Sequence, residues 1–413
     1  MSFLGSSSGA GRVGATLLRH RVIAGTALAA TAVLVAGCAF VATASGSGHE
    51  TLSNVSDNKQ ATKPAPVKTT APPAGPLTLI SVTPAAGDRH ANGGDPITVK
   101  FSSALSAQTP LPTLSPSVPG SWQVSGDTAT FTPTAGYVAG TTVQVKVPGG
   151  ADGMLGAAAS AGTLAKTSRT TFTTGSYSTV RLQQLLAQLG YLPLDWTPSD
   201  PSTGTIADSD ASAQLAAAYQ PPAGTFTFQS GYPSALTRQW RAGTDNILVD
   251  GAVRAFENNQ GLTMDGVAGP EVWADLLKAV GKDETNPSGY TYGLATQGSS
   301  NESLQVWHNG KRILDTPANT GIPASPTTDG TFPVYLRYQV TQMTGLNPDG
   351  TKYDDTVYWV SYFNGGDAVH YFERPGYGYY QSLGCVELEL DPAKFIWPYM
   401  TYGTLVTVTG PVA

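Results

Sequence analysis

The spacing of apolar residues changes twice along this chain, and that change most constrains its fold. From Pro76 to about residue 175, apolar and polar residues alternate, as in "ITVKF" and "VQVKV", which is typical of half-buried strands. Between residues 178 and 280 the apolar residues recur every three or four positions, as on one face of a helix. After residue 288 the alternation returns in "VYWVSYF" and "TLVTVTG". The sequence therefore predicts a multidomain, mainly β protein with a small α domain.

Length and charge narrow the class of protein further. The 413 residues suffice for about two to four domains of ~100–200 residues each. The 47 glycines and 30 prolines agree with the many turns of a β-rich fold. Charged residues make up 13% of the chain, and 23 Lys and Arg against 29 Asp and Glu give a net charge of -6. A negatively charged protein is not suited to bind a polyanion, so we expect no nucleic-acid partner.

The first 38 residues have the pattern of a secretory signal. Arg12, Arg19 and Arg21 precede the apolar run "VIAGTALAATAVLVAGC", which is marginal against the about 20 residues of a membrane span. Its end, "LVAGC", resembles the lipobox of bacterial lipoproteins, which implies a lipid on Cys38; simple secretion is the alternative. We expect a lipoprotein signal peptide at 1–38, a Pro-rich disordered tether at 39–75, and a lipid-anchored protein in the cell envelope, on the outer face of the cytoplasmic membrane.

Residues 76–175 are predicted to form a β-sandwich. The short alternating segments include "LTLISV", "ITVKF", "WQV" and "VQVKV", and Ser125-Gly126-Asp127 supplies a turn between two of the predicted strands. This pattern resembles the bacterial immunoglobulin-like (Ig-like) domains of cell-envelope proteins. The resemblance implies an N-terminal Ig-like β-sandwich that serves as a spacer.

Three helical segments follow at residues 176–284. They are "STVRLQQLLAQLGYL", "GAVRAFENNQGL" and "GPEVWADLLKAVG", the last with Pro270 in its first turn. The segments resemble the three-helix peptidoglycan-binding domain, with an insertion at about 193–247. Asp250-Gly251 and Asp265-Gly266 are expected as turns of that domain. A generic helical module without wall affinity is the alternative.

Cys385 is the first candidate for chemistry. The chain has two cysteines, and if Cys38 carries lipid then Cys385 has no disulfide partner. Stray thiols oxidise outside the cytoplasm, so a free cysteine there favours a functional thiol over a packing residue.

His370 precedes Cys385 by 15 positions, and it lies in "DAVHYF", a predicted strand. An adjacent imidazole that takes the thiol proton would create the nucleophilic thiolate. Gly384 lets the backbone pass close to a substrate, and its N–H with that of Cys385 could face a developing oxyanion. None of the five histidines has metal-ligand spacing, and no phosphate loop appears, so we expect neither metal nor cofactor.

The segment 288–413 resembles the L,D-transpeptidase (YkuD-type) catalytic domain. The resemblance rests on His370 followed by "SLGCVEL", on "ANTGIPASPTTDGTFPVY" and on the final "YGTLVTV". It implies that Cys385 attacks the carbonyl of the diamino acid, the third residue of a peptidoglycan tetrapeptide stem. The terminal D-Ala leaves, protonated through His370, and an amine of a second stem resolves the acyl-enzyme to a 3→3 cross-link. It also implies acylation of Cys385 by carbapenem inhibitors.

Two positions depart from the family pattern. Leu383 stands where the family has a second histidine, and Glu387 stands where it has Arg or Asn. The resemblance implies substrate contacts from Ser382 and Glu387, and from Met343 and Tyr353 in "TQMTGLNPDGTKYDD", a predicted substrate-covering loop. A carboxylate at position 387 is expected to favour an amine or an amidated stem over a free carboxylate.

Three functions stay open on these residues. The first is an L,D-transpeptidase, and the second is an L,D-carboxypeptidase that uses water as the acceptor on the same site. The third is a wall-binding scaffold whose catalytic domain has decayed, to which Leu383 and Glu387 point. Retention of both Cys385 and His370 argues against decay.

Overall fold

The computed structural model describes residues 75–201, 210–298 and 301–410. The predicted signal peptide, Cys38 and the tether lie outside these ranges. Within the described ranges, no helix has the length and apolar content that a membrane crossing requires.

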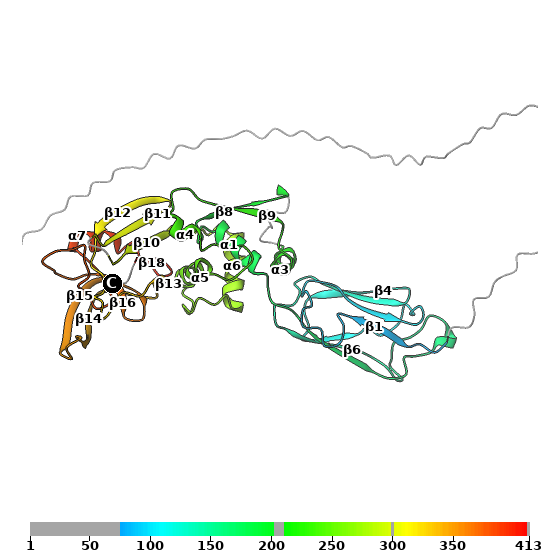
Figure 1. The fold of residues 1–413 in the computed structure, drawn as a ribbon. Helices are drawn as coiled ribbons and strands as arrows, with labels where there is room; N and C mark the ends of the chain where they lie inside the picture. Colours follow the sequence, from blue (N-terminus) through cyan, green and yellow to red (C-terminus); the bar gives the residue numbers. More distant parts are fainter. Residues whose placement is uncertain (1–74, 202–209, 299–300, 411–413) are drawn as a thin grey trace, which may run out of the picture. The chain divides into compact units, whose positions relative to one another are not determined.

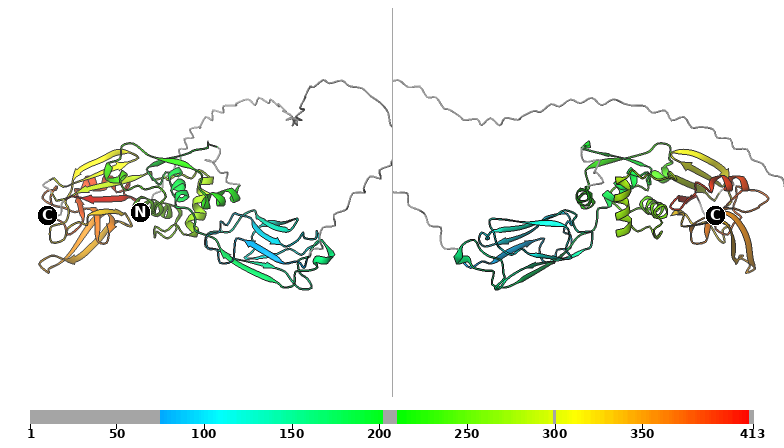
Figure 2. Two further views of the ribbon diagram at one scale, coloured as in Figure 1. Left: turned by 45° about the vertical axis from the view of Figure 1, so that its right-hand side comes forward. Right: turned by 180° about the vertical axis from the view of Figure 1, so that it is seen from behind.

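The predicted β-sandwich has two antiparallel sheets (Figures 1 and 2). One sheet has the order β1-β2-β5-β4 and the other the order β3-β6-β7. Their bounds are β1 Leu79–Thr83, β2 Ile97–Phe101, β3 Thr113–Ser115, β4 Gly120–Ser125, β5 Thr128–Pro133, β6 Thr142–Val147 and β7 Ser168–Thr173. Val99 and Phe131 of the first sheet share a buried core with Val143 and Val145 of the second. The alternation corresponds to burial in β2, β5 and β6, where alternate residues are buried.

The three predicted helices form as α1 (Thr179–Gln188), α5 (Ile247–Gln260) and α6 (Pro270–Gly281). The Asn246 side chain accepts hydrogen bonds from the N–H groups of Leu248 and Val249 and so caps α5. Gly261 ends α5 in the left-handed region at φ 71°. Pro270 occupies the first turn of α6, where its missing N–H costs nothing.

The insertion between α1 and α5 folds onto α1. It contains β8 (Leu194–Pro198) paired with β9 (Gly224–Phe228), together with the helices α3 (Ala211–Tyr219) and α4 (Ser234–Thr237). The fully buried Gln183 of α1 donates from Nε2 to the carbonyls of Arg241 and Thr244, and its Oε1 accepts from the Gly243 N–H. One buried amide therefore holds the end of the insertion against α1.

The predicted turn at Asp250-Gly251 is wrong, because both residues lie inside α5. The cap at Asn246 starts the helix upstream, and Asp250 then pairs with Arg254 one turn later at 3.1 Å. Gly251 is required for a different reason. A Cβ there would lie 2.7 Å from the carbonyl oxygen of Gly403, so α5 approaches the C-terminal segment through a bare backbone.

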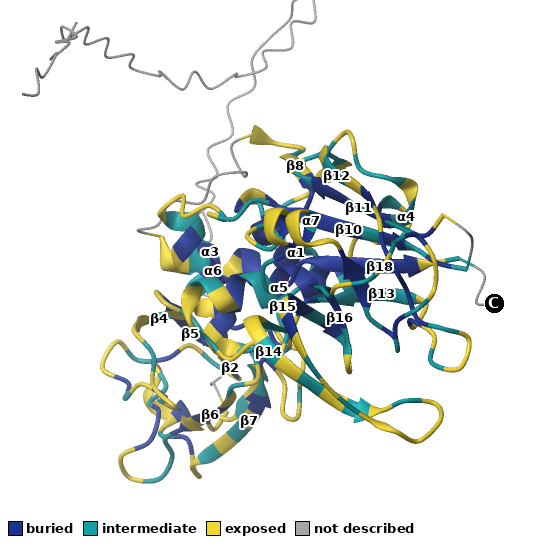
Figure 3. Cartoon of the chain, turned by 90° about the vertical axis from the view of Figure 1, so that its left-hand side faces the viewer, coloured by how far each residue is buried: buried dark blue, intermediate teal, exposed yellow. Residues whose placement is uncertain are grey.

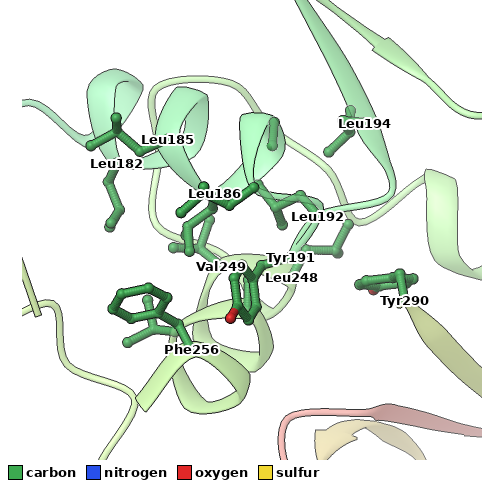
Figure 4. Close-up of a cluster of buried hydrophobic side chains, with 14 of the residues drawn as sticks. Leu182, Leu185, Leu186, Tyr191, Leu192, Leu194, Leu248, Val249, Phe256 and Tyr290 are labelled. Atoms are coloured by element: carbon green, nitrogen blue, oxygen red, sulfur yellow. The ribbon is translucent and has the colours of Figure 1, made fainter. Parts of the chain in front are cut away.

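The helices share one buried core with the C-terminal strands. Leu185, Leu186 and Phe256 belong to the same cluster as Tyr292 and Leu405 (Figure 4 shows its helical part with Tyr290). Burial of such side chains is worth about 1.5–3 kcal/mol each. The helical segment and the C-terminal domain are therefore joined by apolar packing as well as by the chain.

The C-terminal domain contains two sheets and the short helix α7 (Leu390–Ile396). The first sheet has the order β12-β11-β10-β18-β13, and the second the order β14-β15-β16-β17. The bounds are β10 Thr291–Thr296, β11 Ser303–His308, β12 Lys311–Pro317, β13 Gly330–Pro333, β14 Leu336–Leu346, β15 Lys352–Asn364, β16 Asp367–Tyr371, β17 Val386–Leu388 and β18 Leu405–Thr409. Val306 and Val406 of the first sheet share a core with Val369 and Val386 of the second.

The predicted hairpin around Asn309-Gly310 forms between β11 and β12. Both turn residues have positive φ, 48° and 75°, as a type I′ turn demands. The predicted substrate-covering loop is not a loop, because most of it belongs to the long β14–β15 hairpin. Met343 pairs with Asp355, and Gly345 pairs with Tyr353, in an antiparallel ladder. The exposed end of this hairpin contrasts with the buried strands β10 and β18 (Figure 3).

Candidate active site

A cavity of about 760 Å³ lies at the second C-terminal sheet and brings together five of the predicted site residues. They are Met343 on β14, Tyr353 on β15, His370 on β16, Cys385 just before β17, and Glu387 on β17. Ser382 and Gly384 are buried behind this cavity.

The register of β16 and β17 explains why the cysteine and the histidine face the same space. The two strands are parallel, with Val369 opposite Val386 and His370 opposite Glu387. Cys385 therefore enters one position earlier, beside Ala368. Side chains two residues apart point to the same side of a sheet, so Ala368 and His370 share a face with Cys385 and Glu387.

His370 is a buried imidazole, 2% exposed, whose tautomer the backbone fixes. Its Nδ1 lies 3.0 Å from the carbonyl oxygen of Tyr371. A carbonyl oxygen can only accept, so Nδ1 carries the proton and Nε2 keeps its lone pair. Burial lowers the pKa of His370, and the hydrogen bond to Tyr371 and the charge of Glu387 oppose this shift in part. At neutral pH the side chain is a neutral base with one defined basic nitrogen.

Cys385 is a half-buried thiol, and it is protonated in the resting site. Burial raises its pKa to about 12; the N–H of Ala368 opposes this, while Asp367 and Glu387 add to it. The Sγ lies 3.7 Å from the carbonyl oxygen of Gly366, to which the thiol donates. In the resting site the thiol proton is thus directed at Gly366, and the neutral thiol and the neutral imidazole of His370 line the same cavity. This arrangement does not suit a standing thiolate–imidazolium pair.

Ser382 holds the shape of the segment 382–385, here called the cysteine loop. Its side chain has no exposed surface, contrary to the expectation that it contacts the substrate. Its Oγ donates to the Cys385 carbonyl at 2.6 Å and accepts from the Gly384 N–H at 3.2 Å. The Gly384 N–H, expected as an oxyanion donor, is thus already engaged. The Cys385 N–H remains as the donor of that pair.

Gly384 is required by its backbone. Its φ is 122°, and a Cβ there would lie 2.4 Å from Oδ1 of Asp367. Asp367 is itself held by the Thr328 N–H at 3.4 Å, and burial raises the pKa of its carboxyl. A larger residue at 384 would have to displace either the cysteine loop or Asp367.

A buried carboxylate supports the loop before Cys385 from behind, and no sequence motif pointed to it. Glu302 accepts from the Gly298 N–H at 2.9 Å and from the Thr320 N–H and hydroxyl at 2.8 and 2.7 Å. The Thr320 carbonyl in turn accepts from the N–H groups of Gln381 and Ser382, both at 3.0 Å. This series of hydrogen bonds, from Glu302 through Thr320 to Ser382, therefore fixes the position of the loop that carries Cys385.

Glu387 does not offer a free carboxylate to the cavity. It is buried, and Arg374 binds it through two hydrogen bonds, Nε to Oε2 at 2.8 Å and Nη2 to Oε1 at 2.7 Å. This pairing raises the pKa of Arg374. Position 387 therefore does not present an unpaired negative charge, which was the basis for expecting Glu387 to favour an amine or an amidated stem. Arg374 was missed from sequence because it lies in an irregular Gly-rich segment 13 positions away.

Apolar and aromatic side chains form one part of the cavity wall. Met343 and Tyr362 pack with Cys385 against Val357 and Ala368. Tyr362, also missed from sequence, is near enough to the sulfur that a charge on Cys385 raises the pKa of the phenol, after burial. Burial and then Cys385 likewise raise the pKa of Tyr353.

Leu383 lines the cavity, and its carbonyl oxygen accepts from the Ser325 hydroxyl at 2.9 Å. Leu383, at the position where the resemblance implies a histidine, thus leaves the loop backbone anchored. Among residues 75–201, 210–298 and 301–410, no group of three or more His, Cys, Asp or Glu side chains could hold a metal ion.

Comparison with known families gives two matches. Residues 298–408 match the model of the L,D-transpeptidase catalytic domain, and residues 73–174 match that of a bacterial Ig-like domain. These matches confirm the two β-rich assignments made from sequence. Neither match extends over α1, α5 and α6. Among curated proteins, none matches this chain.

Several solved structures are similar to the chain. One is an L,D-transpeptidase from Mycobacterium smegmatis, at 15% identity over 81% of this chain and 100% of the other, with a TM-score of 0.26. L,D-transpeptidase 3 from Mycobacterium tuberculosis has 13% identity over 80% and 98%, with a TM-score of 0.26. The E. faecium L,D-transpeptidase catalytic domain acylated by ertapenem has 27% identity over 29% and 97%, with a TM-score of 0.27.

Proposed function

We propose, from the premise that residues 298–408 belong to the L,D-transpeptidase catalytic-domain family, that this protein forms 3→3 cross-links in peptidoglycan through a Cys385 acyl-enzyme. One observation carries the proposal. Cys385 and His370 face one cavity, and the histidine is locked in the tautomer that leaves Nε2 as the base.

The acylation step follows from this geometry. Cys385 Sγ attacks the carbonyl carbon of the diamino acid in a tetrapeptide stem, while His370 Nε2 accepts the thiol proton. The tetrahedral adduct then collapses, the C–N bond to D-Ala breaks, and the leaving amine takes that proton from His370. In this step the Cys385 N–H stabilises the oxyanion.

The second step reverses these roles. The side-chain amine of another stem attacks the thioester and gives a proton to His370. As the C–S bond breaks, His370 returns the proton to sulfur, which restores the neutral thiol. Burial of both groups favours their neutral forms before and after each step.

Muropeptide analysis tests this function. Purified wild type incubated with tetrapeptide-bearing muropeptides should produce 3→3 dimers, and Cys385→Ala should produce none. Trimmed tripeptides without dimers would show an L,D-carboxypeptidase instead. No product from the folded wild type would favour the decayed scaffold.

We further propose that α1, α5 and α6 bind the cell wall, because their order and the Asp265-Gly266 segment between α5 and α6 are similar to those of the peptidoglycan-binding domain. The insertion covers part of α1, so the binding face would differ from a bare three-helix module. Full-length Cys385→Ala should sediment with purified sacculi. Failure of the folded protein to do so would leave the helices with a structural role alone.

Lipid attachment at Cys38 and localisation at the outer face of the cytoplasmic membrane remain proposals based on "LVAGC". Wild type should fractionate with membranes, and Cys38→Ala should appear in the soluble exported fraction. Equal partitioning of the two into the soluble fraction would contradict the anchor.

A further inference from the structure

We propose that Arg374 is a carboxylate-binding residue of the cavity and sets the preference of the enzyme for a donor stem with a free carboxylate. This inference rests on the proposed function. It deepens that function by naming a chemical group that the site recognises, and it assigns that recognition to a residue outside the Cys385 motif.

The first argument is the unused edge of the guanidinium. Nε and Nη2 of Arg374 bind Glu387, and within the described residues no hydrogen bond engages Nη1. The side chain is 28% exposed and lines the cavity that holds Cys385 and His370. An arginine has five N–H donors, so the edge away from Glu387 still presents donors to the cavity.

The second argument is that this edge is fixed before any ligand arrives. The buried carboxylate of Glu387 holds the guanidinium on one side. On another side, Cζ lies 4.6 Å from the ring centroid of Phe372. A cation held in this way loses little side-chain entropy when it binds a planar carboxylate, which favours recognition.

The third argument is the sign of the neighbouring charges. Asp355, Asp367 and the Arg374-bound Glu387 also line the cavity, and Arg374 is the one cation among the described residues that line it. Asp355 is near enough to raise the pKa of Arg374, behind the larger contribution of Glu387. A substrate carboxylate would thus be repelled elsewhere in the cavity and has one favourable position, at Arg374.

The donor stem offers this chemistry from two sources. One is the carboxylate of the terminal D-Ala, and the other is the second carboxyl of the diamino acid. Each is close in covalent structure to the scissile amide that Cys385 attacks, so both are candidates for the free edge of Arg374. The shared ligand is a carboxylate within a few bonds of the reacting carbonyl.

The experiment uses three donor peptides with the full-length enzyme. One donor has both carboxyls free, one has the diamino acid carboxyl amidated, and one has the terminal carboxyl amidated. Wild type should have a KM about tenfold or more higher for one of the two amidated donors, which identifies the bound carboxylate. Arg374→Gln should raise KM for the free donor by a similar factor, with kcat less affected, and so abolish the discrimination. Arg374→Lys should retain part of it.

Two variants separate binding from folding. Arg374→Gln leaves Glu387 buried without its partner, so the double variant Arg374→Gln/Glu387→Gln removes that unpaired charge and should show the same loss of discrimination. Arg312→Gln is the matched control, because Arg312 pairs with Asp315 at 3.0 Å on β12 and does not line the cavity. It should behave as wild type. Asp355→Asn should lower KM for the free donor.

The outcomes also distinguish this inference from the proposed function. If wild type converts all three donors with equal KM, or if the folded double variant keeps the wild-type preference, Arg374 does not bind a carboxylate, while the transpeptidase function stands. If no donor is converted by wild type, the proposed function fails and the inference falls with it. Iodoacetamide should still add a single mass at Cys385 in the folded double variant, which reports that the thiol remains accessible and the site intact.

Discussion

The raised pKa of Cys385 makes a strong prediction about when the thiolate forms. With a pKa of about 12, roughly one thiol in 10⁵ is ionised at pH 7, against about 3% for an ordinary cysteine near 8.5. The rate of alkylation by iodoacetamide depends on the thiolate. It should therefore rise about tenfold per pH unit from pH 6 to beyond pH 10, with no plateau near pH 8.5.

Acylation by a carbapenem should show a different profile. Burial lowers the pKa of His370, so the imidazole is already neutral at pH 7 and accepts the thiol proton during attack. The acylation rate should then be flat above about pH 7, while the alkylation rate still climbs. In His370→Ala the plateau should disappear, because attack must then wait for the rare thiolate.

The assay follows mass addition at the peptide that contains Cys385, for both reagents, across pH 6–11. The synthetic peptide "SLGCVEL" is the matched control, since it has the same residues without burial and should titrate near 8.5. Partial burial of Cys385 lowers the absolute rate at every pH but leaves the slope intact. An alkylation plateau with a midpoint below pH 8 in wild type would refute the reasoning and indicate a standing thiolate–imidazolium pair.

Three further predictions concern the residues around the thiol. A carbapenem should add one drug mass at Cys385, and Cys385→Ala should take none. His370→Ala should react about 10²–10⁴-fold more slowly at pH 7. An adduct at another residue would contradict the assignment of Cys385 as the nucleophile. Gly384→Ala should lower the acylation rate by at least tenfold, because of the positive φ and the contact with Asp367; a wild-type rate in single-turnover mass spectrometry would show that the loop adjusts freely. Glu302→Gln should lower the free energy of unfolding by about 1.5–3 kcal/mol in urea titration, because a carboxylate that accepts three hydrogen bonds is lost; an unchanged midpoint would show that Glu302 is dispensable.

The strands and helices were predictable where one face of a segment is buried. Val143, Val145 and Val147 alternate because they fill the core of the sandwich, and this spacing is local to the sequence. Asn309-Gly310 was likewise readable, because the positive φ values that it adopts are a property of those two residues. Asp250-Gly251 failed for the opposite reason. Gly251 is required by its close approach to the backbone of Gly403, which lies more than 150 positions away in the sequence. No local sequence pattern indicates that contact.

The site divides in the same way. Cys385 and His370 could be singled out from the sequence because their residue types are rare in the chain and the motif around them is short, and both line one cavity in the structure. The substrate-side residues were harder to place. The buried Ser382 side chain donates a hydrogen bond to the backbone of the Cys385 loop, and the Glu387 carboxylate is bound by Arg374. The partner of a charged side chain is set by tertiary packing, so its effective charge is not a property of its position in a motif.

The approach of α5 to Gly403 has a consequence for how the chain can be divided. Tyr292, Trp307 and Leu405 are covered by side chains from the helices, so a fragment that begins after α6 would expose them to water. We expect the helices and both C-terminal sheets to unfold in one cooperative transition, with similar hydrogen-exchange protection in α5 and β18. The helical segment is therefore not an independent domain that could be exchanged for another. Replacing it with a module from another protein would have to preserve a glycine at the crossing with Gly403 and the apolar side chains around it.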